Sequence, residues 1–177
     1  MKQLSAYFIS LLFAASAMAQ QIPFNYSLKL KPVILANLPG LHSYVYAQSG
    51  GKWLVLGGRK DGLHARQPFN AFPVASNNTD LYVIDVNTLQ FWSASVNSLA
   101  TGLREQLQST NMNFYQDKDT LYVIGGYGYS STSQDHITFP NLTAVSVSGL
   151  INAIMNTTPV SPYFKQITDQ KFAVNGG

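Results

Sequence analysis

The chain has 177 residues, of which 46% are hydrophobic and only 11% are charged, against about 25% charged in typical globular proteins. Its net charge of +3 is small, and no stripe of Lys and Arg is present, which excludes a nucleic-acid-binding protein. The absence of cysteine excludes a disulfide framework, so packing alone stabilises the fold. This length suits one domain with a sizeable core.

The first nineteen residues have the composition of a secretory signal peptide. Lys2 is followed by the apolar run 4–15 and by Ala17-Met18-Ala19, which is an A-x-A cleavage site. We expect cleavage after Ala19, which removes one positive charge and leaves a secreted, periplasmic or cell-surface protein. The alternative is an uncleaved anchor, for which the apolar run is short. With no cysteine in the chain, a lipoprotein anchor is excluded.

A short apolar run followed by two glycines occurs twice. Residues 121–124 precede Gly125 and Gly126, and residues 53–56 precede Gly57 and Gly58. Four large apolar residues in a row predict a strand that is buried on both faces. The glycines allow positive φ angles and the close approach of a neighbouring segment.

Each diglycine lies within a set of four predicted strands, which we name a to d. In the first repeat they cover 42–47, 52–56, 80–86 and 89–94, and in the second repeat 111–115, 120–124, 142–147 and 162–167. Short helices are expected within 98–108 and 149–155. Before the repeats, 26–30 alternates as an edge strand does. After them, 171–174 is expected to begin a third strand a, with Gly176 and Gly177 aligned to the turn at Gly50 and Gly51.

This pattern resembles the kelch motif over residues 41–177. The resemblance rests on the four glycines of the two pairs and on Tyr82 and Trp92 in the first repeat; the second repeat departs from it because Tyr163 or Phe164 replaces the tryptophan. It implies an all-β fold of kelch-type β-propeller blades, each of four antiparallel strands, with about two blades and the start of a third. The chain would then be the N-terminal fragment of a longer protein. A short two-blade protein that oligomerises is the alternative.

The resemblance also implies a domain organisation. The segments are a signal peptide, a lead-in that could close the ring with a strand, a first blade, a connecting loop, a second blade and the start of a third, at 1–19, 20–40, 41–95, 96–108, 109–168 and 169–177. In such a sheet the b–c and d–a connections emerge on one face, and here they are the long ones. Long loops on a rigid scaffold are where binding residues concentrate.

Polar and aromatic residues of these loops form the predicted binding site. Cations in the first loop suit an anionic sugar or a carboxylate, and the second loop offers stacking rings and one acid–base pair. The competing interpretation is a solvated loop in which Asp61 pairs locally, with packed tyrosines beside it. The candidates are Arg59, Lys60, Asp61, His64, Arg66, Arg104, Tyr127, Tyr129, Asp135 and His136.

Catalytic and metal-binding motifs are missing. The three histidines lack the spacing of a metal site, and His42 is expected to make a structural hydrogen bond beside Ser43. Asp117 and Asp119 resemble a turn. Arg104 and Glu105 are expected to form a surface pair or to position the d–a connection. We therefore predict no catalytic residue, no metal and no cofactor.

The resemblance leaves three classes of function open. The first is a non-catalytic exported scaffold that binds a protein or glycan through the long loops, and the sequence favours it. The second resembles galactose oxidase, which requires a Tyr–Cys crosslink that this chain cannot supply. The third is a secreted carbohydrate-active enzyme similar to the sialic-acid epimerases, which would use Arg59 and His64. Expected partners are the ligand and the remaining blades of a longer chain, with no nucleic acid and no membrane span after signal cleavage.

Overall fold

The computed structural model describes residues 26–62 and 71–176, and the chain divides into two compact units, Met1–Ile34 and Leu35–Gly177. The predicted signal peptide lies outside the described residues. In the first unit, residues 26–34 contain no helix or strand, so the edge strand expected at 26–30 is wrong. Alternation produces a strand only where a neighbour supplies backbone partners, and Leu28 and Leu30 are each 83% exposed.

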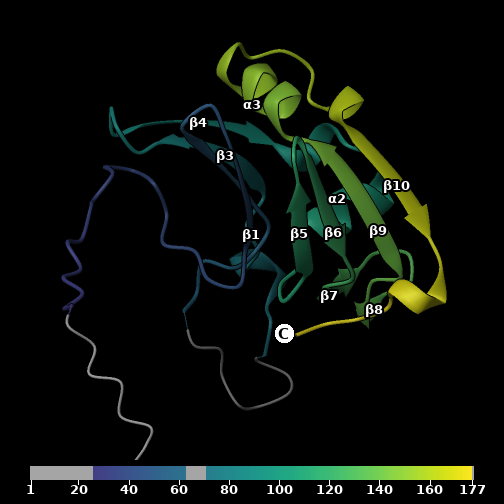
Figure 1. The fold of residues 1–177 in the computed structure, drawn as a ribbon. Coiled ribbons are helices and arrows are strands. Elements are labelled where there is room, and N and C mark those ends of the chain that lie inside the picture. Colours follow the sequence, from purple (N-terminus) through teal and green to yellow (C-terminus); the bar gives the residue numbers. More distant parts are fainter. Residues whose placement is uncertain (1–25, 63–70, 177) are drawn as a thin grey trace, which may run out of the picture. The chain divides into compact units, whose positions relative to one another are not determined.

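The second unit begins with an antiparallel sheet of four strands in sequence order, which we call sheet 1 (Figure 1). Its strands are β1 (Val45–Ser49), β2 (Lys52–Leu56), β3 (Asp80–Asp85) and β4 (Gln90–Ser95). The β1–β2 turn is made by Gly50 and Gly51, with φ angles of 57° and 73°. At the β3–β4 turn, the Asp85 carboxylate accepts the backbone N–H groups of Asn87 and Thr88.

A second antiparallel sheet, sheet 2, has the order β10-β9-β6-β5. It repeats the path of sheet 1 with two insertions, a two-stranded hairpin between β6 and β9 and the helix α3 between β9 and β10. Its strands are β5 (Asn113–Asp117), β6 (Thr120–Ile124), β9 (Asn141–Ser146) and β10 (Phe164–Thr168). The hairpin is formed by β7 (Tyr127–Ser130) and β8 (Asp135–Thr138).

Short helices occupy the connections. Asp119 from the β5–β6 turn caps α3, because its carboxylate accepts the N–H of Ser148 at 2.9 Å and its carbonyl accepts that of Val147 at 2.8 Å, which satisfies N–H groups that the helix leaves unpaired. The helices are η2 (Val74–Ser76), η3 (Val96–Ser98), α2 (Thr101–Leu107), α3 (Val147–Met155), η4 (Ser161–Tyr163) and η5 (Gln170–Phe172).

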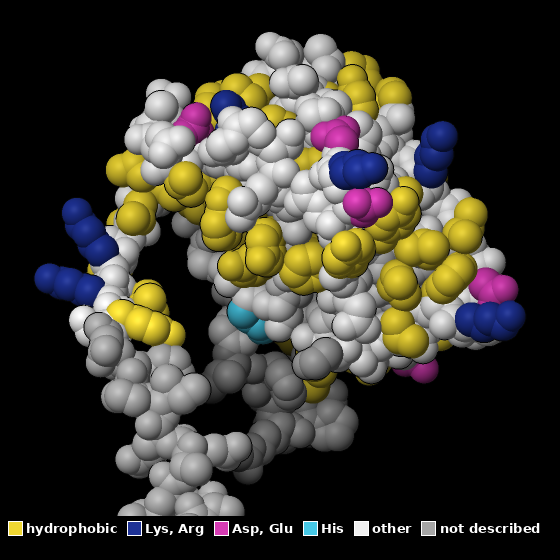
Figure 2. Space-filling model, viewed as in Figure 1, with side chains coloured by type: hydrophobic (Ala, Val, Ile, Leu, Met, Phe, Trp, Pro, Cys, Tyr) yellow, Lys and Arg dark blue, Asp and Glu magenta, His cyan; other side chains and the backbone are white. Residues whose placement is uncertain are grey.

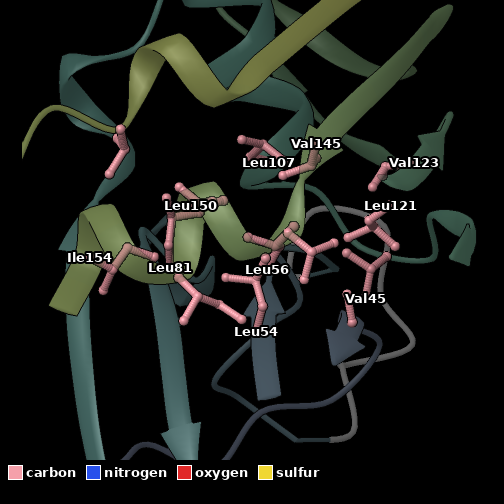
Figure 3. Packing of buried hydrophobic residues seen from close by; sticks show 14 of the residues in the cluster. Val45, Leu54, Leu56, Leu81, Leu107, Leu121, Val123, Val145, Leu150 and Ile154 are labelled. Carbon is pink, nitrogen blue, oxygen red and sulfur yellow. The ribbon is translucent and has the colours of Figure 1, made fainter. Parts of the chain in front are cut away.

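The core lies between the two sheets and beneath α3 (Figure 3). Alternate residues of the central strands face inward, and α3 covers the gap with its apolar side. Burying one such side chain stabilises the fold by about 1.5–3 kcal/mol. The buried side chains include Val45, Leu54, Leu56, Leu81, Leu121, Val123, Val145, Leu150 and Ile154. Trp92 packs against this cluster.

The two sheets approach each other along their first strands. The N–H of Gln48 in β1 donates to Oε1 of Gln116 in β5 at 2.8 Å, and Nε2 of Gln116 donates back to the Gln48 carbonyl at 2.8 Å. Two residues before these glutamines in each strand, the rings of Tyr46 and Phe114 are in edge contact with centroids 5.3 Å apart. β1 and β5 therefore lie side by side, and the last strands β4 and β10 lie at the far edges of the two sheets (Figure 1).

The two diglycines make the same contacts with the segment that follows their sheet. The N–H of Gly58 donates to the Ser109 carbonyl, and the N–H of Gly126 donates to the Val174 carbonyl, both at 2.9 Å. Residues 172–176 thus occupy, beside sheet 2, the place that 107–111 occupy beside sheet 1.

This equivalence corrects the prediction for the end of the chain. Residues 171–174 do not form a third strand a; Asp169 accepts the N–H of Lys171 and caps η5 instead. Gly176 corresponds to Asn111, which precedes β5, and not to the turn at Gly50.

Most strand predictions are confirmed, and two kinds of error remain. The strands predicted at 52–56 and 120–124 have the observed bounds. Both strands a begin later than expected, because Ser43 and Asn111 have φ angles of 53° and 56° and interrupt the extended backbone. The β7–β8 hairpin was predicted as loop. No helix within the described residues is long and apolar enough to cross a membrane.

Candidate functional site

The long b–c connections emerge at the same end of both sheets, which we call the loop face and define as residues 57–62, 71–79 and 125–140. A β-bridge joins His42 to Arg59, and another joins Thr110 to Tyr127, so each b–c loop is paired to the segment that enters a strand a. Gly58 permits this close approach, because a Cβ there would lie 2.5 Å from the His42 carbonyl oxygen. The predicted role of the diglycines is confirmed at this position.

Arg59 is a buried structural residue of the loop face, only 2% exposed. Its Nε and Nη2 donate to the two carboxylate oxygens of Asp61 at 3.1 and 2.6 Å, a bidentate pair. Nη1 donates to Asn77 Oδ1 at 2.8 Å, and Nη2 also donates to the Pro73 carbonyl at 3.0 Å. The guanidinium lies 5.3 Å from the centre of the Phe72 ring. Arg59 therefore organises its own loop, as the competing interpretation expected.

Asp61 connects this buried arginine to the surface. The hydrogen bond from Arg59 and the arginine charge, together with a hydrogen bond from His42, lower the pKa of Asp61 to about 2 although burial opposes the change. His42 Nε2 lies 3.4 Å from Asp61 Oδ1, and its Nδ1 lies 3.2 Å from Ser43 Oγ. The structural hydrogen bond predicted for His42 beside Ser43 is confirmed. Asp61 is consequently ionised at neutral pH.

The aromatic residues of the second loop form a cluster with a residue of the first. The rings of Tyr127 and His136 stack with centroids 5.9 Å apart, and Tyr129 contacts the same imidazole edge-on at 5.6 Å. Phe72 from the first loop meets Tyr127 edge-on at 5.2 Å, and its carbonyl lies 3.0 Å from His136 Nε2. We call Phe72, Tyr127, Tyr129 and His136 the ring cluster. It joins the two b–c loops into one surface.

The acid–base pair expected on the second loop does not form. Asp135 Oδ1 accepts the backbone N–H of His136 at 2.7 Å, whereas the His136 ring is bonded to the first loop. Tyr127, Tyr129 and His136 are half-buried, and Asp135 is exposed. The second loop therefore offers ring surface and a separate carboxylate, which suits binding better than proton transfer between these two side chains.

The remaining candidates are dispersed. Lys60 is exposed on the loop face, while His64 and Arg66 lie outside the described residues. Arg104 and Glu105 make no ion pair in the described part of the chain. Glu105 is 8% exposed and accepts the backbone N–H of Ser131 at 3.0 Å and its hydroxyl. Of the two alternatives expected at 104–105, the surface pair does not form, whereas Glu105 positions the d–a connection by tying α2 to the hairpin.

Several buried amides that shape the loop face were missed by the sequence analysis. Asn77 accepts a hydrogen bond from Arg59, Asn78 donates to the Gly57 carbonyl after β2, and Gln106 donates to the Gly125 carbonyl after β6. Their only sequence signal is a polar residue within or beside an apolar segment, which is not specific. The residues 26–62 and 71–176 hold no group of three or more metal-ligating side chains.

Neither protein-family models nor the curated proteins match this sequence. The site must therefore be interpreted from its own geometry. That geometry is an internally bonded base formed by Arg59, Asp61 and Asn77, with the half-buried ring cluster beside it and Lys60 exposed in the same loop.

Proposed function

We propose that this protein is an exported, non-catalytic scaffold of kelch-type β-propeller blades that binds a protein or glycan partner through its loop face. One observation carries the proposal: the ring cluster joins two long loops from successive sheets into a single surface on a rigid base. Preorganised aromatic surface with few charged groups is typical of binding sites. The signal peptide, with cleavage after Ala19, is part of this proposal.

The propeller architecture is supported by the way the sheets repeat. Two antiparallel meanders meet along their first strands, and the segment after each sheet packs on the preceding diglycine in the same manner. In the second repeat that segment is 172–176, in the position that leads into β5 in the first. We propose that further blades of a longer parent chain continue this arrangement.

The burial of the Arg59 side chain favours binding over the epimerase-like alternative. An enzyme that held a sialic-acid carboxylate through Arg59 would need its guanidinium at the surface. Here the side chain is 2% exposed and its N–H groups donate to Asp61, Asn77 and Pro73. Asp135 and His136 are likewise not paired through their side chains.

A glycan array and a panel of purified extracellular proteins test the proposal on the intact chain. Lys60→Ala and Tyr129→Ala should each weaken the interaction, because both side chains belong to the loop face. Lys165→Ala, in β10 away from this face, is the matched control and should leave it unchanged. Equal binding by all three variants, or sialic-acid mutarotation without retention of any ligand, would overturn the proposal.

A further inference from the structure

A groove runs along the neighbouring edges of β1 and β5, apart from the ring cluster. It consists of two open hollows of about 290 and 370 Å³ that share Phe114. The first begins at Ser43 and Asn111, next to the bridges of the loop face, and the second extends towards Gln48 and Gln116. In the space-filling view, hydrophobic side chains form a band over β1 and β5 (Figure 2).

The groove combines exposed aromatic rings with neutral polar groups. Tyr44, Tyr46 and Phe114 are 36–39% exposed, and Tyr115 is 70% exposed. Ser43, Asn111 and Asn113 contribute a hydroxyl and two amides to the first hollow. Neither hollow is lined by a charged side chain. No hydrogen bond among the described residues uses the side-chain amide of Asn111 or Asn113, so both remain able to donate and accept.

The backbone holds these walls in place without a ligand. Ser43 and Asn111 each follow the residue that forms a β-bridge to a b–c loop, and Gly176 corresponds to Asn111 in the segment after sheet 2. Their φ angles are 53°, 56° and 74°. The N–H of Gly176 donates to the Asn111 carbonyl at 3.0 Å. At the other end, the reciprocal hydrogen bonds of Gln48 and Gln116 join β1 to β5. A preformed groove loses little entropy when it binds.

We propose that this groove binds a neutral saccharide, with one sugar unit in each hollow and Phe114 between them. Aromatic rings bury the apolar C–H face of a sugar ring, and amides match its hydroxyl groups as both donors and acceptors. A lining without charge provides no partner for a carboxylate or sulfate. The inference rests on the glycan-binding part of the proposed function, and it places the glycan in a groove that begins beside the loop face.

The experiment uses the intact chain on an array of neutral and sialylated glycans, followed by titration calorimetry with the best neutral oligosaccharide. Phe114→Ala removes the shared ring, and Asn113→Ala removes one amide from the first hollow. Each should weaken binding about tenfold or more. Tyr122→Ala is the matched control, because this ring is 38% exposed on the adjacent strand β6 and lies outside both hollows. The affinity of this variant should stay within about twofold of the wild type.

Thermal unfolding of each variant identifies any loss of fold. Asn113→Ala, at a half-buried position, keeps the test valid if Phe114→Ala unfolds.

The possible outcomes separate this inference from the proposed function. Loss of neutral-glycan binding in the groove variants alone supports the groove and overturns the loop face as the binding site. Loss in Lys60→Ala and Tyr129→Ala alone overturns the groove and supports the loop face. Preference for sialylated glycans also overturns the groove inference. Binding of a protein and of no glycan overturns it as well but leaves the proposed function intact.

Discussion

We call the place where the diglycine end of strand b meets the start of strand c the corner of a sheet. Buried backbone carbonyls at both corners need hydrogen-bond donors, and different side chains supply them. In sheet 1, the carbonyls of Gly57 and Asp80 accept from Nδ2 of Asn78, which belongs to the same loop. In sheet 2, the equivalent carbonyls of Gly125 and Asn141 accept from Nε2 of Gln106, which comes from α2 in the preceding connection. One corner is thus satisfied locally and the other by a distant helix.

The two repeats are therefore more alike in backbone geometry than in the side chains that stabilise it. A buried carbonyl needs a hydrogen-bond partner, and any amide that reaches it will serve. Gln106 does more than Asn78, because its Oε1 also accepts from Thr143 Oγ1 and from Gln166 Nε2. The second corner therefore depends on a network that links α2, β9 and β10, and its failure should affect the whole sheet.

Replacing the amide of the second corner should have the largest effect. Gln106 is fully buried, and Gln106→Leu removes the donor to the carbonyls of Val123, Gly125 and Asn141 and the acceptor for Thr143 and Gln166. We therefore expect a loss of about 4 kcal/mol in the free energy of unfolding. Urea denaturation measures it. A loss below about 1 kcal/mol would show that water or neighbouring groups replace the network.

Closing the space at the second corner should have the next largest effect. A Cβ on Gly125 would overlap the Val174 backbone at a φ angle of 67°, so Gly125→Ala should cost about 3 kcal/mol and displace residues 172–176. Gly40→Ala is the control, because no atom lies within 4 Å of that Cβ. Thermal unfolding and proteolysis of the C-terminal segment measure both; equal stability of the two variants would contradict the contact.

The local solution in sheet 1 should be less sensitive. Asn78→Leu removes the donor to Gly57 and Asp80 and the acceptor for the Asp80 N–H, at an expected cost of about 2 kcal/mol. Urea denaturation of this variant beside Gln106→Leu compares the two corners directly. If Asn78→Leu proved the more damaging, the first corner would be the one on which the fold depends.

Acid should weaken the Arg59–Asp61 pair of the first b–c loop, with the smallest effect of the four. The pKa of Asp61 is lowered to about 2 from an ordinary value of 3.8, so its contribution is complete above about pH 4 and is lost as the pH falls towards 2. We expect about 1 kcal/mol after solvent screening. Unfolding free energies of wild type and Asp61→Asn at pH 5 and pH 2 measure it; an equal pH dependence in both proteins would contradict the Arg59–Asp61 pair as its source.

The sequence was informative where a residue type has one structural use. Pairs of glycines after apolar runs located β2 and β6, and the helices expected within 98–108 and 149–155 correspond to α2 and α3. It was uninformative for Arg59 and Gln106, because burial of a polar side chain depends on partners that the fold brings from 2 to 60 residues away. The β7–β8 hairpin was missed for a similar reason, since its strands pair across a loop that carries no diglycine.

The central claim is that residues 172–176 repeat the packing of 107–111, and amide hydrogen exchange tests it most directly. The N–H groups of Gly58 and Gly126 should both be protected, because they donate to Ser109 and Val174. Removing the residues after Asp169 should make the Gly126 amide exchange freely and leave Gly58 protected. Fast exchange at Gly126 in the intact chain, or an unchanged rate after truncation, would show that the second corner does not repeat the first.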